Sequence, residues 1–331
     1  MAPALAALWR SVTPADIDTT LPDLWRDAAR DSPVSRALMS NLVIVRHGAR
    51  PPDDEVVHLE AESNIVRIAE RHPARIIVLN YSPDAGRACA PRQATIGVLT
   101  FGAGAVRYGV EVIAVDEVCA EASVPSIVRR LTRGDVPTTV WWTADLSRAR
   151  PPDPMVETGR QFLYDSTGWA EVRLGAARAT AILALPHAPD LADLNWQRLA
   201  PLRSAIVHGL RNELGAGAPV QNGVMIRHRA GEPAAGWLLG AWLRRALRWT
   251  SFPSIEASSN DDEVVTVTLA GERWEMTARM NSQRVLVAGT GEPPPFSIPV
   301  PRQTVADEVI SELRSLGRDM HLRETMLTLA T

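Results

Sequence analysis

The stretch Val136–Leu146 (VPTTVWWTADL) most strongly limits what this chain can fold into. Its β-forming residues lead directly into Trp141 and Trp142, and Thr143 and Asp145 then begin a turn or a helix. In an open α/β sheet, ligands and partners meet the fold at the carboxyl ends of the strands. The stretch therefore predicts a buried strand that carries two indoles and a carboxylate to such an edge.

Two earlier segments predict the sheet to which this strand belongs. Asn41–Val45 is a continuous apolar run, typical of a parallel strand that is covered on both faces. Ala74–Tyr81 is predicted to be the next strand, and Asp53–Arg71 between them has helical spacing. This βαβ unit predicts a parallel pair with a right-handed crossover. Further elements predicted here are a hairpin of Gln93–Phe101 and Tyr108–Val115, helices over Asp116–Thr132, Asp153–Gln161 and Glu171–Ala184, and a short strand at Phe162–Asp165.

A chain of 331 residues is long enough for about two domains. We predict an N-terminal, Rossmann-like layered α/β domain with a largely parallel sheet over residues 1–188. Its first 40 residues are predicted to be helical, with helices at Leu21–Arg30 and Val34–Ser40. A smaller α+β domain is predicted over residues 189–331.

The second domain is predicted from a change in periodicity. Asp193–Leu214 and Ala234–Trp249 have helical spacing, whereas apolar residues alternate with polar ones from Glu263 onward, which predicts an antiparallel meander. Phe296–Val300 is predicted to add an edge strand, and Gln303–Leu316 a terminal helix. The predicted core-facing stripe of the first helix, which Asp193 caps, consists of Trp196, Leu199, Leu202, Ile206, Val207, Leu210 and Leu214.

Composition excludes several kinds of chemistry. All 35 basic residues are arginine, so the chain has no Schiff-base lysine, P-loop lysine or kinase lysine. The net charge of -3 does not favour binding to nucleic acid or to an anionic membrane. No apolar run approaches the roughly 18 residues of a membrane span, and no signal peptide is recognisable, so we expect a cytoplasmic protein.

Motif searches predict no catalytic, cofactor-binding or metal-binding residues. Gly102 and Gly104 lack the third glycine of a dinucleotide fingerprint, because Arg107 stands at that position. His47 and His58 lack a third ligand at metal spacing. The chain has no GxSxG motif. Its two cysteines, Cys89 and Cys119, match no zinc, haem or CxxC spacing, and either free thiols or a disulfide are compatible with the sequence.

Some polar and aromatic residues are nevertheless candidates for binding. Asp145, Asp165 and Ser166 follow predicted strands, where they could act as acid/base groups or cap the next helix. The helix Ala234–Trp249 carries a group of arginines opposite its apolar arc, together with Trp237. This side is either a protein-contact surface, since Trp and Arg dominate hot spots, or a solvated face with Trp237 stacked by Arg244. Its arginines are Arg244, Arg245 and Arg248.

Several stretches, in this order and spacing, resemble the OpcA family, the glucose-6-phosphate dehydrogenase assembly proteins of cyanobacteria and actinobacteria. They are RHPARIIVL (71–79), VPTTVWWTADL (136–146), YDSTGW (164–169), DLNWQRLAPLR (193–203), AAGWLLGAWL (234–243) and the closing VADEVISELRSLGRDMHLRETM. The resemblance implies a non-catalytic partner that binds glucose-6-phosphate dehydrogenase and favours its active oligomer, with no cofactor. The candidate interface residues are Trp141, Trp142, Asp145, Asp165, Ser166, Trp169, Trp237, Arg244, Arg245 and Arg248.

An alternative function stays open at this point. Arg46, Arg50 and Arg75 could bind the phosphate of a sugar phosphate through bidentate contacts at the carboxyl edge of the α/β sheet. A pocket at that edge lined by these arginines would favour a small-molecule sensor or enzyme. The adjacent residues Trp141 and Trp142 must point to opposite faces of their strand, which instead favours a packed junction.

Overall fold

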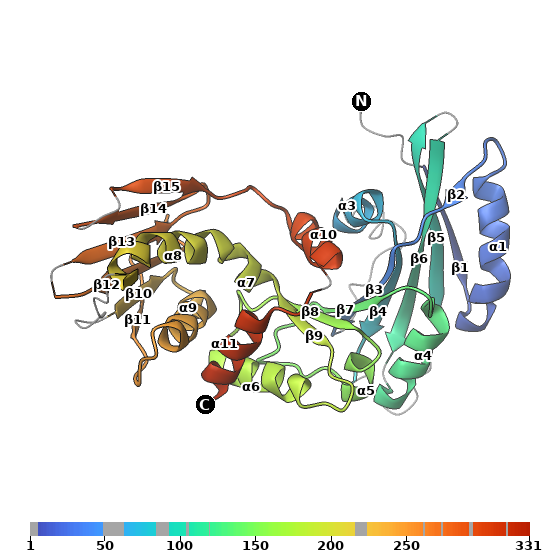
Figure 1. The fold of residues 1–331 in the computed structure, drawn as a ribbon. Helices are drawn as coiled ribbons and strands as arrows, with labels where there is room; N and C mark the ends of the chain where they lie inside the picture. The colour runs from blue at the N-terminus through green and yellow to red at the C-terminus, as the bar shows by residue number, and fades with distance from the viewer. Residues whose placement is uncertain are drawn as a thin grey trace.

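The computed structural model describes residues 6–48, 63–83, 93–103, 106–118, 120–215, 224–260, 262–272, 274–290, 294–315 and 317–331. Within these ranges the chain forms a nine-stranded sheet A and a six-stranded sheet B, each packed against helices (Figure 1). The strands of sheet A lie between Ala6 and Asp193, and those of sheet B between Val224 and Pro299. The chain therefore forms two layered regions in sequence order.

Sheet A has the strand order β1-β5-β6-β4-β3-β7-β8-β9, and β2 pairs with β6. Every neighbouring pair from β6 to β9 is parallel, whereas β1, β5 and β6 pair antiparallel at the other edge. The strands are β1 (Ala6–Val12), β2 (Ser35–Arg36), β3 (Ser40–His47), β4 (Ala74–Tyr81), β5 (Ala94–Ala103), β6 (Val106–Val118), β7 (Thr138–Trp142), β8 (Gln161–Tyr164) and β9 (Asp190–Asp193). The predicted α/β class, the parallel pair β3–β4 and the added hairpin β5–β6 are confirmed.

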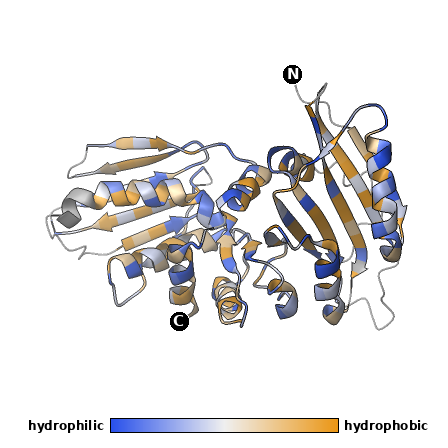
Figure 2. Cartoon of the chain, turned by 45° about the vertical axis from the view of Figure 1, so that its right-hand side comes forward, coloured by the Kyte–Doolittle hydropathy of each residue, from blue (hydrophilic) through white to orange (hydrophobic). Residues whose placement is uncertain are grey.

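Helices cover both faces of sheet A. On one face lie α1 (Ile17–Ala28), α4 (Val124–Leu131), the short α5 (Asp153–Val156) and α6 (Val172–Leu183). On the other lie α3 (Ser63–Arg71) and α10 (Val305–Ser315). The strands between these layers are accordingly rich in apolar residues (Figure 2). This two-sided cover is the reason that all of β4 is buried.

Sheet B has the order β11-β10-β12-β13-β14-β15 and is antiparallel except for the pair β10–β11. Its alternating burial shows that one face is packed and the other is open, as in β10. The packed face lies against α8 (Ala200–Gly215) and α9 (Pro233–Ala246). The strands are β10 (Val224–His228), β11 (Ser254–Ala257), β12 (Val265–Ala270), β13 (Glu275–Met280), β14 (Arg284–Gly289) and β15 (Phe296–Pro299). The predicted meander and its edge strand are confirmed.

The last helices return from sheet B to sheet A. α10 packs beside α3 and α7 (Leu194–Arg198), and α11 (Met320–Ala330) packs against both α6 and α9 (Figure 1). Asp307 of α10 forms ion pairs with Arg67 and Arg71 of α3 at 2.9 and 2.5 Å. Residues 305–330 thus hold the two layered regions together.

The helical prediction for the first 40 residues is wrong in two places. Residues 6–12 form strand β1, which pairs with β5 from Ala6↔Thr100 to Val12↔Ala94. Trp9 lies over Gly97, where a Cβ would come within 2.3 Å of the indole ring, so this glycine makes room for the strand. The helix predicted at Val34–Ser40 is replaced by the short strand β2. In both places pairing with a distant strand overrides local propensity.

The predicted long helix from Asp193 is broken at Leu199 into α7 and α8. Pro201 lies in the first turn of α8, where its missing N–H costs little, but it would disrupt an uninterrupted helix. Val207, placed on the buried stripe by its spacing, is 53% exposed and is not part of the core. The helices predicted over Asp116–Thr132 and Asp153–Gln161 are shorter than expected and correspond to α4 and α5.

Some predictions lie outside the described residues, among them those for residues 53–62, Arg50, His58, Gly104, Cys89 and Cys119. Within the described ranges, no group of three or more His, Cys, Asp or Glu side chains is placed to hold a metal ion. None of the helices in the described ranges combines the length and hydrophobicity that a transmembrane span requires.

Candidate functional site

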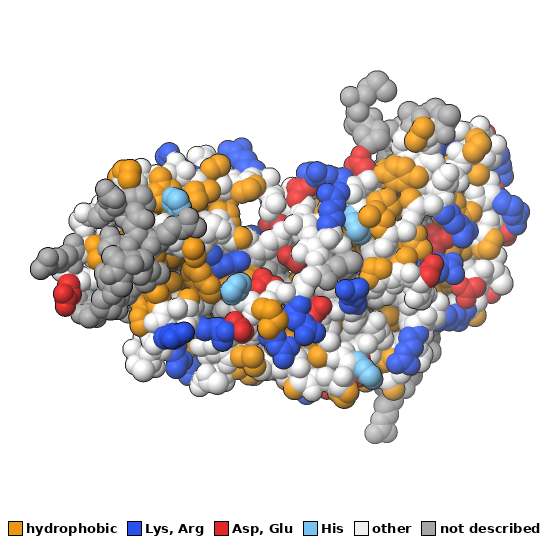
Figure 3. All heavy atoms as spheres, viewed as in Figure 1, with side chains coloured by type: hydrophobic (Ala, Val, Ile, Leu, Met, Phe, Trp, Pro, Cys, Tyr) orange, Lys and Arg blue, Asp and Glu red, His pale blue; other side chains and the backbone are white. Residues whose placement is uncertain are grey.

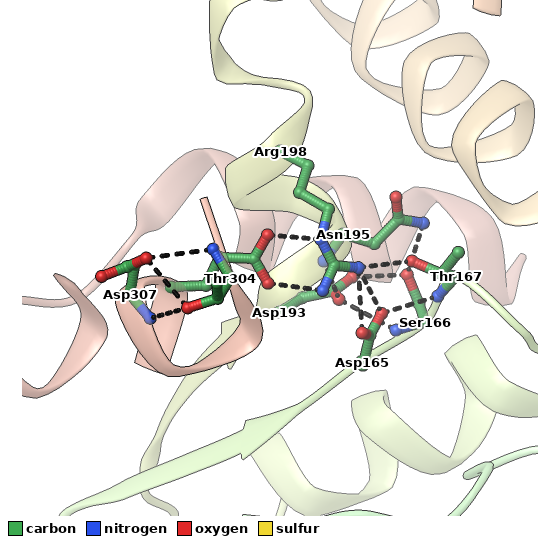
Figure 4. A network of polar contacts seen from close by, with 9 residues as sticks. Asp165, Ser166, Thr167, Asp193, Asn195, Arg198, Thr304 and Asp307 are labelled. Atoms are coloured by element: carbon green, nitrogen blue, oxygen red, sulfur yellow. Dashed lines mark hydrogen bonds and ion pairs between the residues drawn. The ribbon is translucent and has the colours of Figure 1, made fainter. Parts of the chain in front are cut away.

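The carboxyl ends of β8 and β9 bring together two of the sequence motifs. Because the two strands are parallel neighbours, with Tyr164 opposite Asp193, the residues that follow β8 lie beside the end of β9. Ser166 donates from its hydroxyl to Asp193 Oδ2 at 2.7 Å and from its backbone N–H to Asp193 Oδ1 at 3.0 Å (Figure 4). The expected polar groups at a strand edge are therefore present, and they bind each other.

Asp193 has a second role as the N-cap of α7. It accepts the backbone N–H of Asn195 at 3.0 Å, and the Asn195 side chain donates to Ser166 Oγ at 3.0 Å. Burial, and then the nearby charge of Asp165, raises the pKa of Asp193 to about 7. The capping role predicted for Asp193 is confirmed, and the same carboxylate also fixes the turn after β8.

Arg198, at the end of α7, connects three elements. Its guanidinium binds Glu308 of α10 through two contacts of 2.8 and 2.5 Å. It also donates to Asp165 at 3.0 Å and to Thr167 Oγ1 at 2.7 Å (Figure 4). Burial disfavours the charged guanidinium, but its hydrogen bonds to Glu308 and the charge of Asp165 outweigh burial and raise the Arg198 pKa. This bidentate arrangement makes the arginine a bridge between sheet A and the returning C-terminal segment.

Trp196 ties the same junction to α11. Its indole Nε1 donates to Asp319 Oδ2 at 2.8 Å, and Asp319 caps α11 by accepting the N–H of Leu322 at 2.9 Å. The guanidinium of Arg203 lies 3.4 Å from the centroid of the Trp196 ring. Burial lowers the pKa of Arg203 to about 10. Asp193, Asn195, Trp196 and Arg198 of the sequence DLNWQR thus each serve a contact that fixes α7.

A cleft of about 750 Å³ lies beside this junction. One side is formed by residues of the junction, among them Thr167, Arg198 and Glu308. The other side comes from sheet B and from the segment that leads from β15 to α10. The cleft therefore lies between the two layered regions, at the carboxyl end of β8, which is a common position for ligand sites in α/β folds.

Three of the candidate interface residues are buried and hold the fold together. Trp142 is 0% exposed and lies among core aromatics, with its ring centroid 5.6 Å from that of His47. Trp169 is stacked on Tyr164 at 5.6 Å, and Ser166 is fully buried. A buried side chain is not available to a partner, so these three residues do not belong to a contact surface of this conformation.

Trp141 and Asp145 are partly exposed but already have partners. Trp141 packs on the opposite face of sheet A from Trp142, as the strand period predicts. Asp145 accepts the N–H of Ser147 at 2.7 Å and that of Ala170 at 3.2 Å. These contacts show that Asp145 fixes the turn at residues 146–148 and the approach to α6, which favours a structural role over an acid/base role. No helix begins directly after Asp145, so it does not form the predicted helix cap.

The arginines of α9 lie together on the surface. Arg245 pairs with Glu324 of α11 at 2.5 Å, and Arg248 has a left-handed φ of 56°. Arg244 lies over the ring of Phe252 at 4.7 Å, whereas Trp237 is covered by Arg173 at 5.5 Å. The predicted stacking of Trp237 by Arg244 is therefore wrong, because the Arg244 guanidinium lies over Phe252 and the guanidinium over Trp237 is that of Arg173. A shallow depression of about 430 Å³ is lined by Arg244, Arg245, Arg248, Trp249, Glu324, Leu327, Thr328 and Thr331.

The phosphate-binding arginines of the alternative function do not converge. Arg46 lies at the carboxyl end of β3 opposite Asn80, whereas Arg75 lies near the start of β4 opposite Asn41. The two are five residues apart along paired strands, or roughly 16 Å. Arg75 is 2% exposed and forms an ion pair with the buried Glu111, and Arg50 lies outside the described residues.

Sequence reasoning missed Arg198, Glu308 and Asp319 as members of the junction. Arg198 and Glu308 are 110 residues apart, so no local spacing signals their pairing. A usable signal was present for one member, since Asp319 stands three residues before Leu322 in the position of an N-cap.

Two family models match consecutive parts of the chain. Residues 66–179 match the family model described as the glucose-6-phosphate dehydrogenase subunit N-terminal domain. Residues 189–326 match the model described as the C-terminal domain of the same subunit. Together the two matches cover more than half of the chain. No curated protein sequence matches significantly.

Two solved structures show a distant similarity. A candidate oxidoreductase from Magnetospirillum magnetotacticum MS-1 is 12% identical, with 88% of this chain and 98% of that chain covered and a TM-score of 0.33. The super-repressor mutant of Gal80p from Saccharomyces cerevisiae is 7% identical, with 83% of each chain covered and a TM-score of 0.42. At TM-scores below 0.5, neither structure supports a conclusion about this chain.

Proposed function

Since the chain belongs to the OpcA family of glucose-6-phosphate dehydrogenase assembly proteins, we propose that it binds this dehydrogenase in the cytoplasm and favours its active oligomer without itself catalysing a reaction. The observation that carries the proposal is the pair of family matches over residues 66–179 and 189–326. The geometry at the strand edge supports it. Asp193 and Glu308, the most deeply buried ionisable groups there, bind Ser166 and Arg198 of their own chain and hold its parts together.

The activating effect requires unequal binding to two states of the dehydrogenase. A partner that binds both oligomeric states equally shifts nothing, however tightly it binds. To shift the equilibrium tenfold, the chain must bind the active oligomer more favourably by about 1.4 kcal/mol. One or two well-packed side chains at an interface are sufficient for this difference.

We propose that the contact is made by the basic face, which consists of Arg244, Arg245, Arg248 and Trp249 of α9 and its end, with Leu327 of α11. These residues line one depression, and Leu327 is 41% exposed. Figure 3 shows basic side chains gathered over α9. Three guanidinium groups face one carboxylate, that of Glu324, so the surface has an excess of positive charge. A tryptophan among arginines, here Trp249, matches the composition of interface hot spots.

Arg248 gives this surface a second distinguishing property. It follows the end of α9 in the left-handed region, and the N–H of Trp249 bonds to the carbonyl of Arg244 at 2.8 Å. Glycine is the residue usually found at this position of a helix end, because other side chains cost roughly 1 kcal/mol there. A residue kept in an unfavourable conformation on the surface is a reason to look for a binding role.

The test mixes the purified chain with the dehydrogenase from the same cell. We expect co-elution in size-exclusion chromatography, a shift of the dehydrogenase to a larger species and a lower KM for glucose 6-phosphate. If the two proteins elute separately and the dehydrogenase kinetics are unchanged, the proposal fails.

The contact surface is tested with Arg248→Gly. This variant removes a guanidinium and relieves the left-handed backbone, so lost binding cannot be attributed to unfolding. We expect about a tenfold weaker Kd for the dehydrogenase, measured by calorimetry. The matched control is Arg129→Gly, because Arg129 is an exposed arginine in the last turn of α4, away from the basic face. Equal affinities for Arg248→Gly and the unmodified chain would move the interface elsewhere.

A further inference from the structure

The cleft between the two layered regions has the dimensions of a small-molecule site. Its volume of about 750 Å³ falls within the range of pockets that enclose organic ligands. Its walls come from three separate parts of the chain. These are α7 with the start of α8, the end of β13 with the turn after it, and the segment 300–303, and single residues from elsewhere complete the lining, namely Thr167, Arg229, Glu232, Val264 and Glu308. A ligand there would contact both layered regions at once.

One wall of the cleft is apolar. Val264 and Met280 come from sheet B, Val300 and Pro301 from the segment after β15, and Pro201 from the start of α8. Apolar walls with a few polar groups are typical of sites for small organic molecules, because burial of the ligand's apolar surface supplies most of the affinity.

The charges lining the cleft leave one cation uncompensated. Arg198 is neutralised by Glu308, and Arg229 lies 3.5 Å from Glu232. Arg302 also lines the cleft and is exposed, and among the described residues it forms no ion pair. The lining therefore carries one net positive charge that an anion can balance.

The cleft also offers an unused hydrogen-bond acceptor. Gln197 lines it, and the buried Oε1 of this side chain has no hydrogen-bond partner among the described residues. A buried polar atom without a partner costs about 1–3 kcal/mol, and a rotation of the Gln197 side chain toward the cleft would let a ligand hydroxyl or N–H recover it. Nearby, Asn281 is held in place because its Oδ1 accepts the N–H groups of Gln283 and Arg284, both at 2.9 Å.

We propose that this cleft binds a small organic monoanion, with its carboxylate or phosphate at Arg302, its apolar body against Met280 and Val300, and a hydrogen-bond donor for Gln197. The site is independent of dehydrogenase binding and is a property of the chain alone. Because the cleft lies between the two layered regions, a bound ligand contacts both of them and favours the relative arrangement that they have in this structure.

The probe is 8-anilinonaphthalene-1-sulfonate, which has one sulfonate, an aromatic body and one N–H donor. Fluorescence titration of the purified chain should give one site per chain. Arg302→Gln should weaken the Kd about tenfold, and Ser282→Trp, which places a large side chain in the cleft, should abolish binding. Arg284→Gln is the matched control, because Arg284 is exposed on β14 of the same sheet and does not line the cleft. It should leave the Kd unchanged.

Competition distinguishes the sources of the anion. Displacement of the probe by benzoate supports a carboxylate ligand, and displacement by inorganic phosphate supports a phosphate ligand. An equal Kd in Arg302→Gln and the unmodified chain, or binding that survives Ser282→Trp, overturns the proposal. Displacement of the probe by neither benzoate nor inorganic phosphate also overturns it. Because the titration contains no dehydrogenase, failure here leaves the assembly function untouched.

Discussion

The junction around Arg198 and the basic face of α9 use the same residue type for opposite purposes. Arg198 is 27% exposed and forms ion pairs with both Asp165 and Glu308, so its charge is neutralised by carboxylates of its own chain. The basic face has three arginines and one carboxylate, and Arg245 and Arg248 are exposed while Arg244 is partly exposed. The comparison teaches that an arginine's role follows from how its charge is balanced. Matched charges fix the architecture, whereas unmatched ones remain available to another molecule.

The comparison is tested most strongly by Arg198→Ala, for which we expect the largest change in the free energy of unfolding. Removal of the guanidinium leaves Glu308, which is 6% exposed, without its bidentate partner, and a buried unpaired charge is strongly destabilising. We expect a loss of about 3 kcal/mol in the free energy of unfolding, measured by urea denaturation with circular dichroism. Arg198→Lys should recover part of the loss. A change of less than about 1 kcal/mol, the size typical of exposed pairs, would mean that the junction is no different from the surface.

The second effect concerns pH and Asp193. Its pKa is raised from 3.8 to about 7 in the folded chain, so the folded state binds more protons than the unfolded state between these values. The stability that Asp193 contributes is fully present below about pH 4 and is lost as the pH rises to about 7. Above pH 7 the titration of Asp193 changes the stability no further. Asp193→Asn, which can still cap α7, should remove this pH dependence, whose slope cannot exceed about 1.4 kcal/mol per pH unit.

The measurement is urea unfolding at several pH values between 4 and 8. Burial, and then Asp319, also raises the pKa of Glu312 to about 7, so Glu312→Gln is needed as a parallel variant. Parallel stability curves for Asp193→Asn and the unmodified chain would show that Asp193 is ionised throughout this range.

The third predicted effect is a gain in stability on the basic face, opposite in sign to the loss expected for Arg198→Ala. Arg248→Gly should raise the free energy of unfolding by about 1 kcal/mol, because glycine adopts a φ of 56° without the cost borne by arginine. The readout is the urea midpoint, with Arg248→Ala as the control that removes the guanidinium and keeps the backbone cost. If both variants change stability equally, the left-handed backbone is not the cause.

The smallest effect is expected for Arg245→Ala. Its pair with Glu324 is 2.5 Å long, but the arginine side chain is 50% exposed, and exposed ion pairs contribute little. We expect a loss of stability below about 0.5 kcal/mol by urea denaturation, and weaker binding to the dehydrogenase by calorimetry. A loss comparable to that of Arg198→Ala would mean that the pair of Arg245 with Glu324 stabilises the fold as strongly as the pair of Arg198 with Glu308.

Much of the fold could be predicted because periodicity and strand composition carry the information. The apolar runs at β3, β4 and β7 and the alternation in β12–β14 predict sheets A and B correctly. Strand β1 could not be predicted, because it exists through pairing with β5, which lies more than 80 residues later. Its sequence alternates between half-exposed and exposed positions and carries no strong signal of its own.

The site was less predictable for a related reason. The cap Asp193 and the opposite orientations of Trp141 and Trp142 follow from local rules and are confirmed. The partners of Arg198 and Trp196 come from α10 and α11, which lie more than 100 residues away. Only the three-dimensional return of the chain brings them together, so the sequence indicated charged groups without indicating which ones neutralise each other.

The return of α10 and α11 also sets the order of events at the ribosome. Asp307 meets Arg67 across 240 residues of intervening chain, and Thr180 of α6 bonds to the Met326 carbonyl across 146. Domains generally fold as units from the N-terminus during synthesis, at roughly 5–20 residues per second. The apolar side of α3 and that of α6 are both made long before their covering helices. At that rate the residues between Arg67 and Asp307 take about 12–48 s to synthesise and those between Thr180 and Met326 about 7–29 s, so both apolar surfaces stay uncovered, and accessible to chaperones, for that time.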